Sequence, residues 1–370
     1  MRTLPLLMSI AVVLAHDVSS ICSNDLDCSL NGRCSAGSCL CAVPWMGATC
    51  AVLNRTATPN RGIFGYKPNI TSTWGGNVLQ DDNGTFHLYA SEIDGGLTKF
   101  IVKSRVAHAV SSTVEGPYTR LGEALGVVSH NPQAVRYSRD RWLIYHIGNA
   151  AHYQSAGSWL HSASSPFGPW SPVTEYRVSC NNPSPWVLAN KTILLLCTGP
   201  WRMYAAPKPE GPYTLLPMHG NTFQELNTNT TRKGVKGYWE DPFLFQDERR
   251  NWHILSHTYT EQGAGPLNSI SGHLFARHYQ GPWIVSPTEP YSNVVRYTDG
   301  TEQTFSTIER PKLFFNKDGV PTHLINGVSP VYPCHSCGGG PKGQGWCCWC
   351  KLTTGLDYTY TLMQPLGPGR

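Results

Sequence analysis

The chain has 370 residues, only 14% of them charged, and a formal net charge of +5. Its 29 Lys and Arg residues are scattered rather than gathered in a basic run, which speaks against a nucleic-acid partner. With 36 Gly, 28 Pro and 11% aromatic residues, the composition favours an all-β protein with many turns over a helical one.

Residues 1–20 have the pattern of a signal peptide. Arg2 supplies a positive charge, residues 4–14 form an apolar run too short to span a bilayer, and Ala15 is a plausible cleavage residue. No later run reaches about 18 apolar residues, so we expect a soluble, secreted, extracellular protein with no membrane span. N-glycosylation sequons, which agree with that route, begin at Asn54, Asn69, Asn83, Asn190 and Asn229.

Residues 21–50 contain six cysteines, and in a secreted chain this density predicts a disulfide scaffold. Cys39-Leu40-Cys41, followed by Gly47 and Cys50, resembles the signature of an epidermal-growth-factor-like (EGF-like) module. The resemblance implies the pairs Cys22–Cys34, Cys28–Cys39 and Cys41–Cys50. Calcium-binding EGF modules carry an acidic cluster before the first cysteine, and residues 18–21 here are not acidic. The module could bind a protein partner or act only as a spacer.

Residues 51–72 are polar and contain two sequons, as is typical of a linker. Beyond them, five segments begin with a polar residue, usually followed by Pro, and continue as an apolar run. Trp239-Glu240-Asp241-Pro242-Phe243 is the clearest of these segments. The five segments begin at positions 77, 131, 182, 241 and 310. A repeat of about 50 residues predicts a β-propeller.

Each segment leads through a turn, such as Asp82-Asn83-Gly84, into a second apolar strand. Gly-Pro-aromatic turns follow in four repeats, at residues 116–118, 168–170, 211–213 and 281–283. We therefore predict five blades of four strands for residues 73–330. The predicted fold class is all-β, a five-bladed β-propeller with a small disulfide-rich N-terminal EGF-like module.

Seven cysteines lie outside the EGF-like stretch. We expect residues 331–370 to form a Cys-rich segment and a C-terminal strand that packs on the propeller. Cysteines of this segment favour disulfides in an oxidising compartment, although Cys-x-x-Cys spacing also suits zinc; they are Cys334, Cys337, Cys347, Cys348 and Cys350. Cys180 and Cys197 flank the third hairpin and could bridge it. Thirteen cysteines leave an odd one, either free or intermolecular.

The innermost strands of a propeller begin around one central pocket, so the five leading residues should converge there. Together with their neighbours they suit a sugar, whose hydroxyl groups need hydrogen bonds and whose ring faces pack on aromatic side chains. The predicted pocket residues are Asn77, Asn131, Asn182, Asp241 and Arg310, with Glu240, Glu309, Trp74, Trp186 and Trp239 beside them.

The fivefold pattern of residues 73–330 resembles the propellers of glycoside hydrolase family 43, which includes arabinanase- and xylosidase-like enzymes. The resemblance implies an inverting mechanism with an Asp of blade one as general base, an Asp of blade three that tunes the acid, and a Glu of blade four as general acid. Glu240-Asp241-Pro242 matches the blade-four signal, so Glu240 inherits the acid role. Asn77 and Asn182 stand in place of the two Asp residues, and an amide cannot act as a general base.

Several alternatives remain at this stage. Glu309 could be the second catalytic carboxylate, or Asp241 could replace Glu240, because adjacent strand residues face opposite sides. Asn or Asp before Pro can instead cap the start of a strand, and Arg310 could neutralise a carboxylate or bind a ligand. Related propellers hold a central cation through a His, so a calcium or sodium ion is conceivable. The histidines near second strands could equally be structural; they are His87, His146, His253, His257 and His323.

Two functions follow from these residues. The first is a secreted glycosidase that acts on an extracellular polysaccharide, with Glu240 as acid and an atypical base. The second is a carbohydrate-binding, lectin-like propeller without hydrolysis, whose EGF-like module serves adhesion. The carboxylates Glu240, Asp241 and Glu309, with Arg310, favour the first function, whereas Asn77 and Asn182 favour the second. Of the two we expect the first, a glycoside hydrolase-like protein. The EGF-like module allows a third function, in adhesion or signalling.

Overall fold

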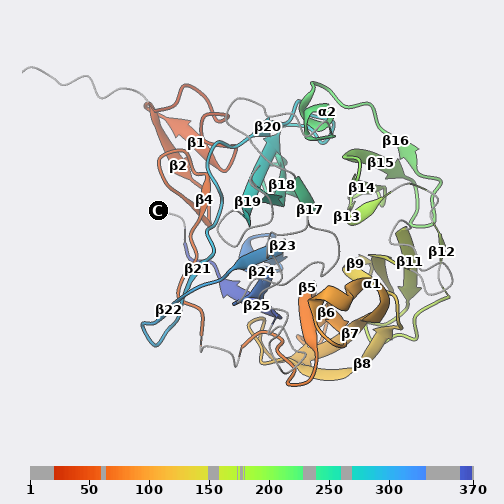
Figure 1. Ribbon diagram of the computed structural model, residues 1–370. Helices are drawn as coiled ribbons and strands as arrows, with labels where there is room; N and C mark the ends of the chain where they lie inside the picture. Colours follow the sequence, from red (N-terminus) through yellow and green to blue (C-terminus); the bar gives the residue numbers. More distant parts are fainter. Residues whose placement is uncertain are drawn as a thin grey trace, which may run out of the picture.

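The computed structural model describes residues 21–59, 64–148, 158–172, 174–175, 178, 180–227, 239–259, 269–330 and 359–368. It consists of a small N-terminal module and five antiparallel sheets arranged around an axis (Figure 1). The predicted all-β, five-bladed propeller is confirmed. The proposed signal peptide and Cys334 to Cys350 lie outside the described residues. Among the described helices, none is long and apolar enough to cross a bilayer.

Four blades contain four strands each, and the innermost strand of each blade comes first in the chain. In blade 1 the strands are β5 (Ser72–Gln80), β6 (Phe86–Ile93), β7 (Ser104–Ser111) and β8 (Thr119–Leu125). In blade 2 they are β9 (His130–Ser138), β10 (Arg141–Ile147), β11 (Ser158–Ala163) and β12 (Thr174–Glu175). In blade 3 they are β13 (Asn181–Val187), β14 (Ile193–Thr198), β15 (Arg202–Ala206) and β16 (Thr214–Leu215). In blade 4 they are β17 (Trp239–Gln246), β18 (Trp252–Tyr259), β19 (Ser269–Ala276) and β20 (Ile284–Val285).

Blade 5 differs from the expected four strands. In the described chain it has three, namely β23 (Thr307–Phe315), β24 (Pro321–Ser329) and β25 (Tyr360–Pro365). Its outer edge instead meets the segment that follows the N-terminal module, because Arg55 bridges to Leu366 and Tyr66 bridges to Thr361. Two short helices, η1–α1 (Leu97–Lys99 and Phe100–Lys103) and α2 (Thr222–Asn227), and the hairpin β21–β22 (Val294–Arg296 and Glu302–Thr304) complete the propeller.

The Gly-Pro-aromatic repeats form turns at the outer edges of blades 1 to 4. Each glycine has a positive φ, between 82° and 94°, a conformation that glycine adopts at little cost. Tyr118, Tyr213 and Trp283 each donate a hydrogen bond to the carbonyl oxygen four residues earlier. Tyr118 Oη reaches Val114 O at 2.9 Å and Trp283 Nε1 reaches Tyr279 O at 3.1 Å. The repeat is therefore a structural device.

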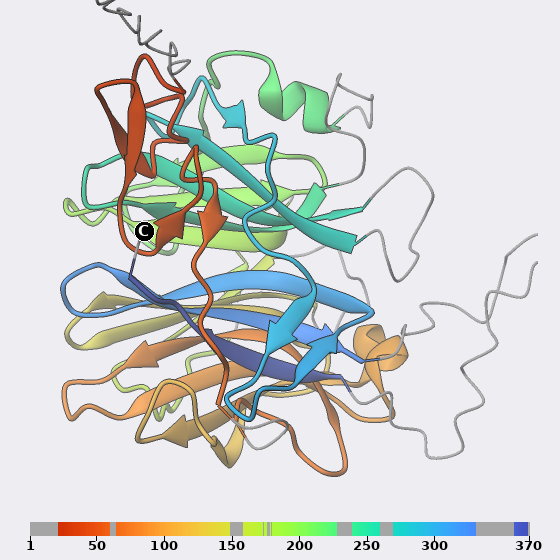
Figure 2. The same cartoon turned by 90° about the vertical axis from the view of Figure 1, so that its left-hand side faces the viewer.

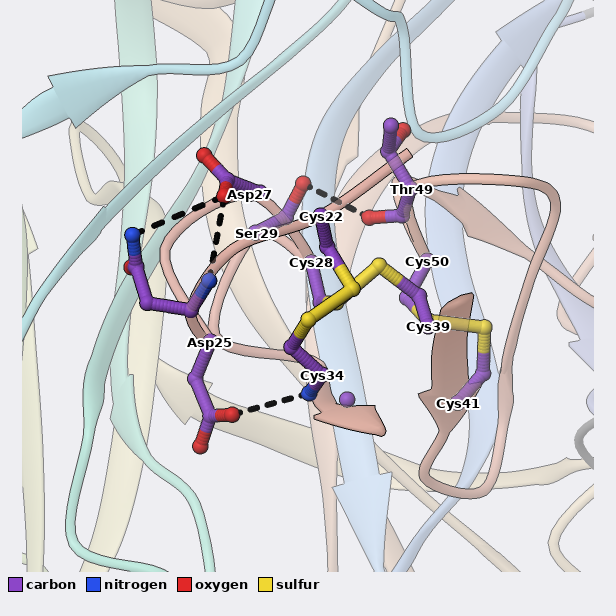
Figure 3. The surroundings of a disulfide bond; sticks show 12 residues. Cys22, Asp25, Asp27, Cys28, Ser29, Cys34, Cys39, Cys41, Thr49 and Cys50 are labelled. Carbon is purple, nitrogen blue, oxygen red and sulfur yellow. Dashed lines mark hydrogen bonds between the residues drawn. A yellow bond between two sulfur atoms is a disulfide. The ribbon is translucent and has the colours of Figure 1, made fainter. Parts of the chain in front are cut away.

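The N-terminal module is held by three disulfides (Figure 3). They are Cys22–Cys34, Cys28–Cys39 and Cys41–Cys50, the pairs that the EGF-like resemblance implies. Its strands are β1 (Gly32–Ser35), β2 (Ser38–Cys41), β3 (Trp45–Met46) and β4 (Val52–Leu53). A fourth disulfide joins Cys180 to Cys197 beside the blade-3 hairpin.

The module packs directly against blades 4 and 5 (Figure 2). The Trp45 ring stacks on His273 with 5.0 Å between ring centroids. Arg249, in the β17–β18 turn, donates to the carbonyl oxygens of Leu30 and Gly32. One hydrophobic core runs from Trp45 and Leu53 into the propeller, so the module and the propeller share a core.

Candidate functional site

A β-bulge interrupts every inner strand near its start. In blade 4, for example, the pairing with β18 jumps from Glu240 to Phe243. The first bulge residue has a positive φ between 49° and 63° in all five blades, and these residues are Gly75, Asn131, Asn182, Asp241 and Arg310. Non-glycine residues seldom adopt this conformation. The bulge turns the residue toward the axis and explains the Pro that follows it in four blades.

The bulges correct the alignment of blade one. Gly75 is equivalent to Asp241 there, and Asn77 lies two residues further along β5. Blade one therefore offers no side chain to the ring. The space is used by blade 5, because a Cβ atom on Gly75 would lie 2.8 Å from Arg310 Cδ. The repeat pattern pointed to Asn77 because it is the polar residue directly before the apolar run Val78-Leu79, whereas Gly75 has no polar side chain.

Asn77 does not line the axial cavity at the ring. Its Nδ2 donates to Ala134 O at 2.7 Å, and its Oδ1 accepts from Ala134 N at 2.8 Å. Asn77 is buried and joins the inner strands of blades 1 and 2. Its amide is needed for this pair of bonds, since a carboxylate could not donate.

The other four ring residues come together as the repeats suggest. Asn131, Asn182, Asp241 and Arg310 line a cavity of about 20 Å³, with Lys312 deeper in it. Asn131 Nδ2 donates to Asn182 Oδ1, which links the bulges of blades 2 and 3. A cavity of this size holds about one water molecule. A sugar would have to lie outside this cavity, against its rim.

Two of the predicted aromatic platforms are buried instead. Trp74 is 2% exposed and packs in a small core with Ile93 and Leu97. Trp239 is 5% exposed and packs closely over Gly272. Sequence position placed both tryptophans next to the ring, but the alternation of a strand turns their side chains into the spaces between blades. Trp186 is half-buried and lies toward the other end of the channel.

The three predicted carboxylates surround one imidazole. His257, on β18 opposite Glu240, is fully buried. Its Nδ1 lies 3.7 Å from Glu240 Oε1 and 4.0 Å from Asp241 Oδ2, and its Nε2 lies 3.8 Å from Glu309 Oε1. The Glu240 side chain is 21% exposed, whereas those of Asp241 and Glu309 are only 2% and 6% exposed. Glu240 is thus the carboxylate of this cluster that a ligand can reach.

The environment shifts the protonation of this cluster. Burial raises the pKa of Asp241 to about 6, opposed by Arg310 and reinforced by Glu240. Burial lowers the pKa of His257, but the negative charges of Glu309 and Glu240 raise it by more than burial lowers it, so the net shift is upward. Burial lowers the pKa of Lys312 to about 8 against the attraction of Asp241. The neighbouring carboxylates therefore favour the protonated form of His257.

Arg310 and Lys312 supply the remaining positive charge. Arg310 Nη1 lies 3.6 Å from Asp241 Oδ1, and Lys312 Nζ donates to Pro242 O at 3.4 Å. Lys312 was not predicted as a site residue. Its position in the repeat could have indicated it, because Lys312 lies two residues after the bulge residue Arg310, as Asn77 lies two residues after Gly75.

The cluster could also hold a cation. One oxygen or nitrogen from each of Glu240, Asp241, His257 and Glu309 lies within 4.8 Å of the others. Neither oxygen of Asp241 has a hydrogen-bond partner. Three carboxylates and one imidazole suit a divalent ion. The positive charges of Arg310 and Lys312 already offset part of the charge that such an ion would neutralise.

The carboxylates are too close for the expected inverting geometry. That reaction needs two carboxyl groups about 6.5–9.5 Å apart with a water molecule between them. The facing atoms of Glu240, Asp241 and Glu309 lie within 4.8 Å, all on blades 4 and 5. Among the residues that the structure describes, the facing bulges of blades 2 and 3 carry Asn131 and Asn182, which cannot activate water as a base.

Comparisons with known proteins separate the two parts of the chain. Residues 24–53 match the family described as Teneurin-like EGF domain. No curated protein matches the chain by sequence. The solved structures that resemble the propeller include an endo-arabinase from Bacteroides thetaiotaomicron (TM-score 0.50, 14% identity, 82% of this chain and 97% of that chain).

Two further structures extend this comparison. The GH43B protein of the Bacteroides ovatus xyloglucan PUL has a TM-score of 0.52 at 15% identity, over 81% of this chain and 54% of that chain. An exo-β-1,3-galactanase from Phanerochaete chrysosporium has a TM-score of 0.51 at 12% identity, over 85% of this chain and 64% of that chain. The fold is that of the family 43 propellers. This chain spans just over half the length of the Bacteroides ovatus protein and just under two thirds of the length of the galactanase.

Proposed function

We propose that this protein is a secreted glycan-binding propeller that recognises an extracellular polysaccharide with the rim of its axial cavity beside Glu240, Asp241 and Arg310. The observation that carries the proposal is the one-sided arrangement of charge. All three carboxylates belong to blades 4 and 5, and the facing blades present amides. The propellers of similar fold include an endo-arabinase and an exo-β-1,3-galactanase, which supports a carbohydrate as the ligand.

The reachable groups at the rim match what sugar hydroxyls need. Glu240 is 21% exposed and accepts hydrogen bonds, and Arg310 is 16% exposed and donates them. Behind them, His257 and Asp241 are buried and hold the two side chains in place through charge. A carboxylate and a guanidinium side by side give a hydroxylated ring one acceptor and one donor for neighbouring hydroxyl groups.

Hydrolysis is the second candidate, and one observation favours it. The raised pKa of Asp241, about 6, keeps part of this carboxyl group protonated near neutral pH, which a general acid requires. Glu240 would then be the nucleophile or base on the open side. The close spacing of the carboxylates would suit a retaining rather than an inverting reaction, since retaining enzymes place the two groups about 5 Å apart.

A glycan array and a reducing-sugar assay, run on the full chain, separate these functions. Glu240→Gln keeps the shape of the side chain and removes its charge, and Glu302→Gln is the matched control, because Glu302 is an exposed carboxylate paired with Arg296 on a distant hairpin. We expect binding to a neutral polysaccharide that falls about tenfold in Glu240→Gln, because a hydrogen bond to a charged group is lost, and stays unchanged in Glu302→Gln.

Two results would contradict the binding proposal. One is an array on which the parent protein binds no glycan. The other is sugar release by the parent that Glu240→Gln abolishes, which would establish the hydrolase. Equal behaviour of both variants would remove Glu240 from the site.

A further inference from the structure

A second, larger cavity opens at the opposite end of the propeller channel. Its volume is about 400 Å³, in the range of small-molecule sites. The inner strands β5, β9, β13, β17 and β23 all contribute to it, through residues that follow the bulges. The bulges turn toward the axis at one end of these strands, and this cavity lies toward the other. It is therefore separate from the site at Glu240.

Aromatic side chains form much of its wall. Phe315 lies between Trp186 and Phe243, with ring centroids 6.1 Å and 6.3 Å away. Trp186 and Phe315 are only half-buried. Trp186 meets both Phe315 and Trp252 at steep interplanar angles, 73° and 78°, rather than in a stack. An indole in this arrangement can receive the face of a ligand ring.

One polar group in the wall is without a partner. Gln133 is 3% exposed and lines the cavity, and its Oε1 has no hydrogen-bond partner. An unpaired buried acceptor costs free energy, so a hydroxyl or N–H group from a bound molecule would relieve it. A purely apolar ligand would not.

The charges of the cavity cancel. Arg136 binds Asp82 through two parallel hydrogen bonds of 2.7 Å and 2.8 Å. Asp81 accepts from the backbone of its own turn and faces His87 at 3.3 Å. Lys317 is exposed at the rim. Two carboxylates and two cations give no net attraction for an anion or a cation, which points to a neutral ligand.

We propose that this far mouth, lined by Trp186, Phe315 and Gln133, is a second glycan site that binds one neutral sugar residue. The ring face packs on Trp186. A hydroxyl group donates to Gln133 Oε1 after this side chain, whose oxygen is shielded from solvent in the unbound protein, turns toward the cavity. The cavity at the carboxylates measures about 20 Å³ and cannot enclose a sugar, whereas this one can. The inference rests on the proposed function only for the class of ligand, because the two sites share no side chain.

Saturation-transfer NMR on the full chain tests the site, with the methyl glycosides of arabinose, xylose and galactose as probes. Methyl phosphate, an anion with a detectable methyl signal, and the aromatic dye ANS serve as comparison probes. We expect a neutral glycoside to bind. Gln133→Leu should weaken it about fivefold, the size of one neutral hydrogen bond, and Trp186→Leu should weaken it further. Phe167→Leu, at an exposed aromatic outside the cavity, is the matched control.

The outcomes also distinguish the two sites. A glycoside affinity that falls in Gln133→Leu but not in Glu240→Gln supports a far-mouth site, whatever happens to polysaccharide binding at Glu240. Retained affinity in Gln133→Leu, or binding of methyl phosphate or ANS without binding of any glycoside, overturns the proposal. Thermal unfolding of each variant shows whether it is folded. Because Trp186 also packs on Trp252, the Gln133→Leu result decides if Trp186→Leu does not fold.

Discussion

Replacing Asn77 by Asp would restore the residue type that the family resemblance leads one to expect in blade one. The structure predicts the opposite of a gain in activity. Asn77 Nδ2 donates to Ala134 O at 2.7 Å. In the Asn77→Asp variant a carboxylate oxygen would take the place of this donor and would repel Ala134 O. Only the bond from Ala134 N to Oδ1 would remain. The new charge would be buried, since Asn77 is 5% exposed.

The expected loss of unfolding free energy at pH 7 is about 3–5 kcal/mol, the usual cost of an uncompensated buried charge. For a domain of this size it corresponds to a fall in Tm of roughly 10 °C. Burial raises the folded-state pKa of such a carboxyl group above its unfolded value. The deficit relative to the parent should therefore be full at neutral pH and shrink as the pH falls through that raised pKa.

Scanning calorimetry from pH 7 to pH 4.5 measures this effect, alongside the reducing-sugar assay. Asn316→Asp is the matched control, because Asn316 uses its Oδ1 to accept from the backbone of its own turn, at Asp318 and Val320, and Asp can do the same. We expect its Tm to match that of the parent. An Asn77→Asp protein with the stability of the parent at pH 7, or with new hydrolytic activity, would refute the assignment of Asn77 as a link between blades.

Three further changes test the rest of the structure. Burial lowers the pKa of His108 to about 4, so between pH 6.5 and pH 4 the unfolded state binds a proton that the folded state does not. We expect the free energy of unfolding to fall by about 3 kcal/mol over this range. A Tm that stays constant from pH 6.5 to pH 4 would contradict this expectation. Replacing Cys180 and Cys197 together by Ala opens a bridge with a sequence separation of 17 and should cost about 3 kcal/mol in urea unfolding, whereas an unchanged midpoint would show that the bridge adds nothing. Arg249→Ala removes the side-chain donor to Gly32 O and leaves Leu30 O with only the 3.5 Å hydrogen bond from Asn251 Nδ2. It should make the N-terminal module more susceptible to limited proteolysis, and equal cleavage of parent and variant would show that the Arg249 contact does not hold the module.

The sequence by itself determined the fold. Local devices repeat in it: the polar-Pro start of each inner strand, the tight hairpin turns and the Gly-Pro-aromatic turns. Each of these depends on the conformations of a few neighbouring residues. The resemblance of Cys39-Leu40-Cys41, Gly47 and Cys50 to the EGF-like signature likewise implied the three disulfide pairs of the module, and the structure contains them. The prediction of four strands in blade 5 was wrong. In the described chain this blade has three strands, and the third comes from residues 360–365, within the segment from which a C-terminal strand was expected.

Tertiary structure decided the site. Whether a polar residue at a strand start faces the axis or a neighbouring blade depends on the bulge register, which separates Asp241 from Asn77 although both begin an apolar run. The grouping of Glu240 and Glu309 around His257 joins strands far apart in the chain. The aromatic wall of the far mouth likewise requires three blades to meet. Contacts of this kind arise when the sheets pack around an axis, and no single repeat contains the information that fixes them.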